Sequence, residues 1–513
     1  MKQLIVQSRQ PFATFRVLQA AVLCAWLAGC NVGPKYVPPA TTAPPAYKES
    51  PTQFKESEGW TVAQPNDATL RGKWWEIYNE PDLNALEDQL DVGNQNIRQA
   101  FENYMEARAL VRETRAQLFP TLSIGGAYNR SQASSNIGSS SNSNTGVPAG
   151  TQSQLFSLPA DVSWEPDLWD KVRNAIRSSQ YQAQLTAADL ENERLTEQAS
   201  LAEFFFEIRG QDELQKILND TVDADQKAVE SEKARYETGF DDQISLVEAQ
   251  TTLASAQSAA INVGIARSQY EHAIAMLIGK PASEFSIPVH PQTCAPPPIP
   301  IGMPSQLLER RPDVAAEERS MASANAQIGV AYAAYYPALT ISASGGVESS
   351  TIKNLLSSAS RFWSVGPSVS ETVFDGGLRR ATVNQYIATY NADLAAYRQS
   401  VLTAIQQVED YLAQVRILSQ QIQRQQEAVD SAQTFLKLEQ ARFDTGIDPY
   451  IDVVTAQTTL LSNQQTLTGL QMQQMTASIQ LIQALGGGWD RSQLPTPSQI
   501  TQKPSHADTT IQH

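Results

Sequence analysis

The chain has 513 residues, a formal net charge of −16, three cysteines and four histidines. The acidic balance and the lack of a Lys/Arg-rich patch argue against a nucleic-acid partner and favour an acidic surface or lumen. Cys24, Cys30 and Cys294 are too few and too scattered for a disulfide framework, and the histidines show no metal-ligand spacing.

Basic residues and a short apolar run over residues 17–27 open the chain, a pattern typical of an export signal and too short for a stable membrane-spanning helix. Leu27-Ala28-Gly29-Cys30 follows and is typical of a bacterial lipobox, in which the cysteine thiol is acylated before cleavage. We expect a signal peptide over residues 1–29, with diacylglycerol and an N-acyl lipid on Cys30. Asn31 follows the cysteine, and because it is not Asp, the resemblance of this stretch to bacterial lipoproteins implies passage to the outer membrane. The alternative is an unlipidated signal with an incidental cysteine.

A lipidated N-terminal tether is predicted over residues 30–70, because this stretch is rich in Pro, Thr, Ala and Glu and has little periodicity. Trp74-Trp75 then opens the folded region. An amphipathic helical pattern continues to Phe119 and ends at Pro120.

The hydrophobic period changes to two at residues 121–130 and again at 155–165, on either side of a long polar loop. The second half repeats the change at 338–348 and 362–373. Strands of about ten residues with aromatic residues near their ends match the pattern of outer-membrane β-strands. The alternative is two soluble β-hairpins packed on helices.

One stretch of the chain occurs twice. Ala234-Arg-Tyr-Glu-Thr-Gly239 returns about 207 positions later as Ala441-Arg-Phe-Asp-Thr-Gly446. Each glycine follows a long helical pattern, and a second helical pattern begins a few residues later. Asp242 leads it in one copy and Asp448-Pro449 in the other, which predicts a cap followed by proline at the first helical position. Each copy therefore predicts a tight turn between two long helices, with hairpin tips near residues 239 and 446.

The repeat predicts a tandem duplication. Its parts are a first repeat over 71–287, a Pro-rich connector over 288–304, a second repeat over 305–489 and a disordered tail over 490–513. Apolar residues recur every seven positions from Val401 to Phe443, which predicts left-handed coiling of the helices on their neighbours. About 65 residues of helix would extend for roughly 100 Å.

Four strands per chain cannot stand alone in lipid, because the backbone groups at the sheet edges would have no partners. Two copies would give an eight-stranded barrel filled by side chains, whereas three copies give twelve strands and a lumen. The predicted fold is therefore mainly α with membrane β: a trimeric twelve-stranded β-barrel, four strands per chain, continued by a long α-helical barrel.

Several motifs together resemble the outer membrane factor (TolC-like) family, in its lipoprotein branch, often called NodT or OprM-like. They are the lipobox with Asn31-Val-Gly-Pro-Lys-Tyr36, Trp74-Trp75, Leu308-Glu-Arg-Arg-Pro-Asp-Val314, Ala324-Asn-Ala-Gln-Ile-Gly329, Phe374-Asp-Gly-Gly377 and the two tips. The resemblance covers nearly the whole mature chain. It implies a homotrimeric exit duct in the outer membrane that docks onto a periplasmic adaptor and an inner-membrane RND-type transporter for multidrug efflux.

The hairpin tips are the first candidate site, because in the family they meet the adaptor. The candidate docking residues are Arg235, Tyr236, Thr238, Gly239, Arg442, Phe443, Thr445 and Gly446. The alternative is that the aromatic residues fill heptad positions and the glycines only end helices.

A periplasmic gate is the second candidate site. Where the TolC-like pattern has two acidic residues after the second turn, this chain has Asp452 and then Thr455. Three symmetry-related Asp452 carboxylates around one bore would repel one another and select cations, although Thr455 departs from a double acidic ring. The alternative is that Asp452 only stabilises the first turn of a helix.

No phosphate loop, nucleophile motif or metal spacing is present, so the chain is not expected to be an enzyme or to need a cofactor besides its lipids. Arg310-Arg311-Pro312-Asp313 is typical of a helix start. Two other functions stay open: the exit duct of a type I protein secretion system, and a poreless coiled-coil lipoprotein that spaces the envelope.

Overall fold

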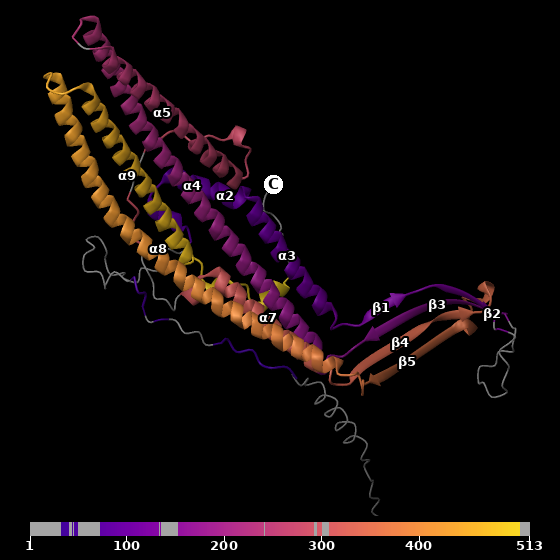
Figure 1. Ribbon diagram of the computed structural model, residues 1–513. Helices are drawn as coiled ribbons and strands as arrows, with labels where there is room; N and C mark the ends of the chain where they lie inside the picture. Colours follow the sequence, from indigo (N-terminus) through magenta and orange to yellow (C-terminus); the bar gives the residue numbers. More distant parts are fainter. Residues whose placement is uncertain are drawn as a thin grey trace, which may run out of the picture. The chain divides into compact units, whose positions relative to one another are not determined.

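The computed structural model describes residues 32–39, 44, 46–49, 72–132, 134, 152–240, 242–291, 295–299 and 307–502 (Figure 1). The predicted signal peptide, Cys30 with its lipids and Cys294 lie outside these residues. The chain forms two compact units. Of the described residues, one unit contains those within 32–38, 107–183 and 320–394, and the other contains those within 39–106, 184–319 and 395–502.

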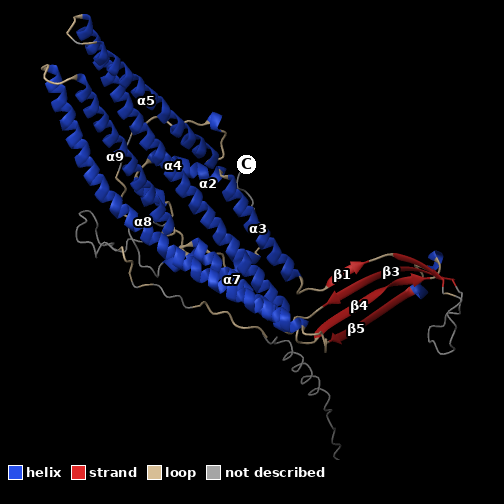
Figure 2. Cartoon of the chain, viewed as in Figure 1, coloured by secondary structure: helices blue, strands red, loops and turns tan. Residues whose placement is uncertain are grey.

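The first unit holds an antiparallel sheet (Figure 2). Its strands are β1 (Thr121–Ile124), β2 (Ala127–Gln132), β3 (Gln152–Trp164), β4 (Ala338–Ser349) and β5 (Arg361–Ser370). The strand order is β1-β3-β4-β5. The strand β1 pairs with residues 160–163 of β3, and β2 pairs with residues 152–157 of the same strand. The sheet is thus four strands wide, as predicted, with its first strand in two pieces.

The break between β1 and β2 falls at Gly125-Gly126, opposite Leu158 and Pro159 of β3. Pro159 has no N–H to donate, so the hydrogen-bond ladder is interrupted there. The N–H of Gly125 still donates to the carbonyl of Pro159 at 3.0 Å. A Cβ on Gly126 would lie 3.2 Å from a Leu158 methyl, which favours glycine at this crossing.

The register of the sheet separates apolar from polar side chains. Two neighbouring rows on one face are Leu122–Val162–Ala343–Val365 and Ile124–Ala160–Gly345–Trp363. The row between them, on the other face, is Ser123–Asp161–Ser344–Ser364. Successive residues of a strand point to opposite faces, so one face is apolar and the other polar.

The second half of the chain repeats the long helices of the first. The helix α4 (Lys171–Glu237) matches α8 (Leu378–Asp444), with 67 residues each. The helix α5 (Gln243–Leu277) matches α9 (Tyr450–Ala484), with 35 residues each. Shorter helices precede them: α2 (Pro81–Gly93) and α3 (Gln95–Ala116) in the first half, and α6 (Leu307–Arg310) and α7 (Pro312–Ala333) in the second.

The core of the second unit lies where α2 and α9 pack against α4. Its largest fully buried side chains are Trp74, Leu83, Leu90, Leu201, Phe205, Ile208, Ile274 and Ile479. Trp74 belongs to the 3-10 helix η3 (Trp74–Tyr78), so the two tryptophans that open the folded region anchor its core. Among the described residues, no helix combines the length and apolar character needed to cross a membrane.

The prediction of a disordered tail is wrong for residues 490–502. Asp490 accepts a hydrogen bond from the N–H of Ser492 to start the 3-10 helix η8 (Arg491–Gln493). Thr496 and Gln499 form a capping box at α10 (Pro497–Thr501), and Ile500 is fully buried. The tail is polar in composition, but two local caps and one apolar anchor suffice to order this part.

Candidate functional site

Both hairpin tips have the backbone expected of a helix ended by glycine. Gly239 and Gly446 have φ values of +72° and +75°, in the left-handed region that disfavours side chains. The hydroxyls of Thr238 and Thr445 each donate to two carbonyls of the preceding helix turn. These four residues therefore shape the turns.

The two tip arginines occupy equivalent positions but have different contacts. The guanidinium of Arg235 lies 4.4 Å from the ring centroid of Phe443 and 5.3 Å from that of Phe240. Arg235 therefore joins the first hairpin to the second. Arg442 instead donates to the carboxylate of Asp448 at 2.9 Å, within its own hairpin.

The two tip aromatic residues also differ. Phe443 is 4% exposed and packs with Ala249, Tyr450 and Val453, whereas Tyr236 is 43% exposed. The heptad-core alternative therefore describes the Phe443 ring, which is not presented at the surface of the chain. Tyr236 remains available to a partner.

Sequence reasoning missed two exposed apolar residues at the tips. Phe240 is 75% exposed and Ile447 is 67% exposed, and each follows the turn glycine. A large apolar residue directly after the turn in both copies was the available signal. An exposed apolar pair at two equivalent turns is typical of an interaction surface.

Asp452 lies in the first turn of α9, and Pro449 rather than Asp448 occupies the N-cap position. The hydroxyl of Thr455 donates to the carbonyl of Ile451 at 2.8 Å, so its hydrogen bond is made within its own helix. Thr455 stays a predicted gate residue.

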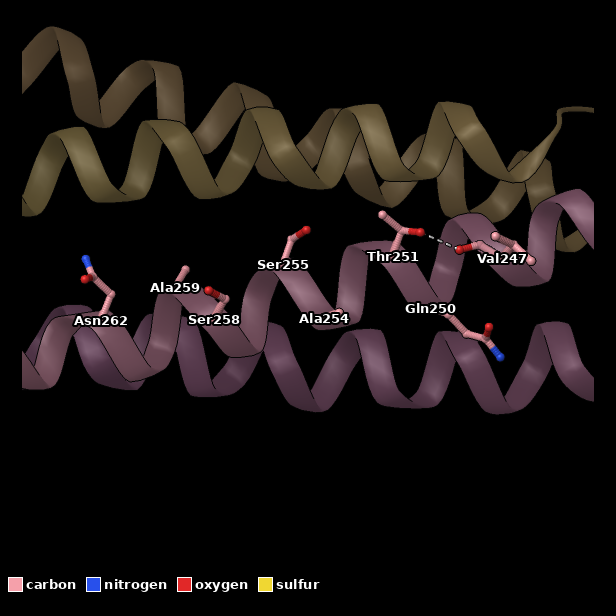
Figure 3. A pocket seen from close by; sticks show the side chains of 8 residues that line it. All are labelled: Val247, Gln250, Thr251, Ala254, Ser255, Ser258, Ala259 and Asn262. Atoms are coloured by element: carbon pink, nitrogen blue, oxygen red, sulfur yellow. Dashed lines mark hydrogen bonds between the residues drawn. The ribbon is translucent and has the colours of Figure 1, made fainter.

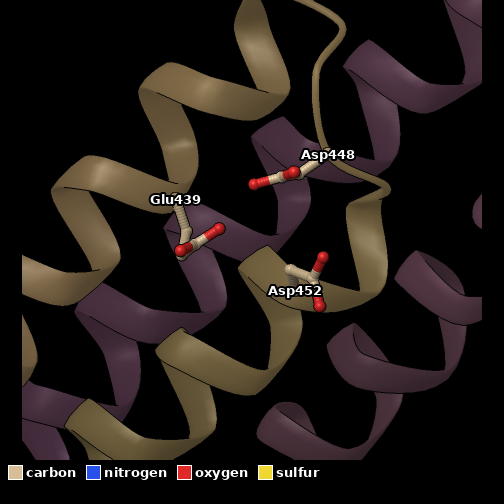
Figure 4. A group of neighbouring side chains, drawn as sticks. All are labelled: Glu439, Asp448 and Asp452. Atoms are coloured by element: carbon tan, nitrogen blue, oxygen red, sulfur yellow. The ribbon is translucent and has the colours of Figure 1, made fainter.

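Three carboxylates gather beside the second turn (Figure 4). The oxygens of Glu439, Asp448 and Asp452 lie within 4.8 Å of one another. Desolvation is the largest cause that raises the pKa of Glu439, and the hydrogen bond to Asp448 is the second. The positive charge of Arg442, which pairs with Asp448, lowers the pKa of Glu439 in part. Exposed acidic clusters are common without an ion, and we assign no metal to this one.

Buried acids lie between the two hairpins near their tips. Asp225 of α4 is almost fully buried and accepts a hydrogen bond from the amide of Gln457 of α9. Burial raises the pKa of Asp225. Burial, and then the charges of Asp225, Glu232 and Glu248, raise the pKa of Tyr450 to about 12. This contact between the hairpins is therefore polar and protonatable.

The family model for outer membrane efflux proteins matches residues 86–280 and 303–487, once in each half of the chain. The chain belongs to the outer membrane efflux protein family. An outer membrane location, a helical part in the periplasm and a role as a channel subunit in efflux follow. The family is one of transport components.

Similar proteins extend over most of this efflux protein. The probable efflux pump outer membrane protein TtgC of Pseudomonas putida is 28% identical over 490 residues, covering 93% of this chain and 96% of TtgC. The solvent efflux pump outer membrane protein SrpC of the same species is 29% identical over 475 residues, covering 91% of this chain and 97% of SrpC. The solved outer-membrane channel OprN has a TM-score of 0.79 at 25% identity, covering 90% of this chain and 100% of OprN.

Proposed function

We propose that three copies of this efflux protein form a passive exit duct of a tripartite pump, held in the outer membrane by the strands and by lipid on Cys30. A periplasmic adaptor and an inner-membrane RND-type transporter complete the pump. The duct exports drugs or other small toxic compounds.

The sheet carries this proposal. It is four strands wide, apolar on one face and polar on the other, and among the described residues β5 and the β1–β2 side have no strand beyond them. An open sheet of this kind leaves backbone groups unpaired in lipid. Twelve strands from three copies close the sheet, turn the polar face inward and leave a lumen.

The duct itself supplies no energy. Motifs for phosphate binding or nucleophilic catalysis are lacking in the sequence, so the protein is proposed not to be an enzyme. The adaptor meets the tips, where Tyr236, Phe240 and Ile447 are exposed. Docking shifts the hairpins like an iris, and three Asp452 carboxylates form the narrow, cation-selective ring.

Small molecules are favoured over proteins as cargo. SrpC is named for a solvent efflux pump, and it covers nearly the whole of this chain. A duct for type I protein secretion would share the fold, and is the second candidate. A poreless spacer is disfavoured because it has no use for a sheet with one apolar and one polar face.

Single-channel conductance in planar bilayers tests the proposal. Wild type should give a small, cation-preferring conductance, and Asp452→Ala should raise the conductance and reduce the preference. Glu237→Ala, which removes an exposed carboxylate of the first hairpin, is the matched control and should leave both unchanged. A trimeric sample in which neither wild type nor Asp452→Ala conducts would count against the open-duct proposal and for the spacer.

A further inference from the structure

Small side chains let another segment of chain approach a helix closely. A shallow groove along α5 is lined by small uncharged side chains such as Ala254 and Ser258, and it is open in the part of the chain that the structure describes (Figure 3). A surface between α4 and α7, within the first unit, is instead covered by residues 32–36. The covered surface therefore shows which partner it fits.

The contact between this N-terminal segment and the helices centres on two glycines. A Cβ on Gly33 would lie 2.6 Å from the Cα of Gly329 in α7. A Cβ on Gly329 would in turn lie 2.6 Å from the side-chain amide nitrogen of Asn174 in α4. The first of these clashes is with backbone, which has no rotamer to change. Glycine at position 33 is therefore needed for the segment to reach α7.

Polar and aromatic contacts hold the rest of the segment. The side-chain amide of Asn325, which is 9% exposed, donates to the carbonyl of Pro34 at 3.1 Å. The ring centroid of Tyr36 lies 6.1 Å from that of Tyr181 in α4. The motif that follows the lipobox and the motif over residues 324–329 are far apart in the sequence, and they are thus two sides of one contact.

This contact lies near the ends of the helices that lead to the strands. Gly329 is about one turn before the end of α7, which precedes β4, and Asn174 is in the first turn of α4, which follows β3. Cys30 comes three residues before Gly33, so the chain between them spans at most about 11 Å. The cysteine is therefore confined to the neighbourhood of the sheet.

We propose that this contact is a fixed seat for the lipid anchor, so that the acyl chains on Cys30 enter the membrane beside the sheet. The inference rests on the lipid proposed on Cys30. A link of three residues keeps the sheet at the membrane surface, whereas a free tether would let it move away. Effective concentration falls roughly as the −3/2 power of linker length, so a link of three residues in place of about 40 raises the concentration of the sheet at the membrane about 50-fold. The seat therefore assists insertion of the sheet.

Lengthening the link without changing the contact tests the inference in full-length protein. An eight-residue Gly/Ser insertion between Asn31 and Val32 extends the link from three residues to eleven and leaves every contact residue in place. Formation of the heat-modifiable trimer in outer membranes, followed by pulse–chase, should slow by about sevenfold. The same insertion between Thr42 and Ala43 is the matched control. It follows the contact, so the link to the anchor keeps its length and the rate should not change.

Removing the contact is the complementary test. Gly33→Ala should release the segment, because the new methyl group would collide with the backbone of α7. Trypsin should then cut after Lys35 at least tenfold faster than in wild type, and the trimer should form as slowly as with the insertion before Val32. Val37→Ala removes a side chain that is 71% exposed and should change neither rate. The mass of the released N-terminal peptide reports both the cut site and the lipid.

The outcomes separate this inference from the proposals on which it rests. Equal rates of trimer formation for the two insertions, in lipidated protein, overturn the fixed seat and leave the proposed duct standing. Equal cutting after Lys35 in wild type and Gly33→Ala also overturns the seat. A released peptide without acyl chains overturns the lipid proposed on Cys30 together with this inference. A wild type that forms no trimer overturns the proposed duct and the role of the seat in insertion.

Discussion

Glu87 has its carboxyl group in a buried environment that disfavours the ionised form. It lies in α2 between Leu83 and Leu90, is fully buried, and neither carboxyl oxygen has a hydrogen-bond partner among the described residues. Burial, and then the charges of Asp91 and Asp88, raise its pKa well above the ordinary value of 4.5. We therefore expect Glu87 to be protonated in the folded protein over a pH range in which the unfolded chain is ionised.

The sign of the effect follows from proton linkage. Above pH 4.5 the folded state holds one proton more than the unfolded state, so stability falls as pH rises, by about 1.4 kcal/mol per pH unit until the raised pKa is reached. Glu87→Gln should remove this dependence on pH. Glu87→Met should also remove the unpaired polar atoms and gain about 1–3 kcal/mol.

Denaturant unfolding followed by circular dichroism at pH 5 and pH 8 measures both effects. Asp88→Asn is the matched control on the exposed side of the same helix. It removes a surface ion pair with Lys73 and only the smallest of the causes that raise the pKa of Glu87, so most of the dependence on pH should remain. Wild type should lose stability between the two pH values by more than Glu87→Gln does. Lower stability of both Glu87→Gln and Glu87→Met at pH 8 would contradict a buried, unpartnered carboxyl, because it would mean that the carboxyl has a stabilising partner.

Two further predictions concern the junction between α7 and the long helices. Gly486 has a φ of +93°, and a Cβ there would lie 2.1 Å from the carbonyl oxygen of Arg310, so Gly486→Ala should destabilise by about 3 kcal/mol or more. The control is Gly469→Ala on α9, where a Cβ would meet no atom within 4 Å, and it should stabilise the protein by up to about 1 kcal/mol. Equal melting temperatures for the two variants would contradict the predicted clash at Gly486. Arg311 ties the start of α7 to α8 and to the end of α9 through a buried guanidinium, so Arg311→Lys should cost about 2–3 kcal/mol. The control is Arg424→Lys on the exposed face of α8, which should change the unfolding midpoint little. A similar loss of stability in both variants would contradict a stabilising role for the hydrogen bonds of the Arg311 guanidinium.

Local chemistry made the hairpins readable from the sequence. Glycine is needed where φ is positive, and threonine readily bonds a helix carbonyl, so the tips near 239 and 446 and the long helices on either side could be predicted. The strands were predicted from their period of two. The interruption at Gly125-Gly126 was not, because it depends on Pro159 in a partner strand 33 positions away.

The candidate site was only partly predictable, because equivalent positions in a duplicated chain do not have equivalent neighbours. Phe443 faces the first hairpin and is buried, whereas Tyr236 is 43% exposed among the described residues. Arg235 and Arg442 differ for the same reason. A repeat motif predicts a local conformation well, but the contacts of its side chains depend on what lies next to each copy.

The matched lengths of the two hairpins place a condition on how this chain can change during evolution. Both pairs of helices have 67 and 35 residues. Loss of one heptad from both arms of a single hairpin would draw its tip back by about 10 Å relative to the other. The heptad pattern along the helices would survive this loss, but Arg235 and Phe443 would no longer meet. Insertions and deletions in the helices are therefore expected in synchrony, in whole heptads and in all four helices together, so that the duct lengthens or shortens as a unit to suit envelopes of different depth.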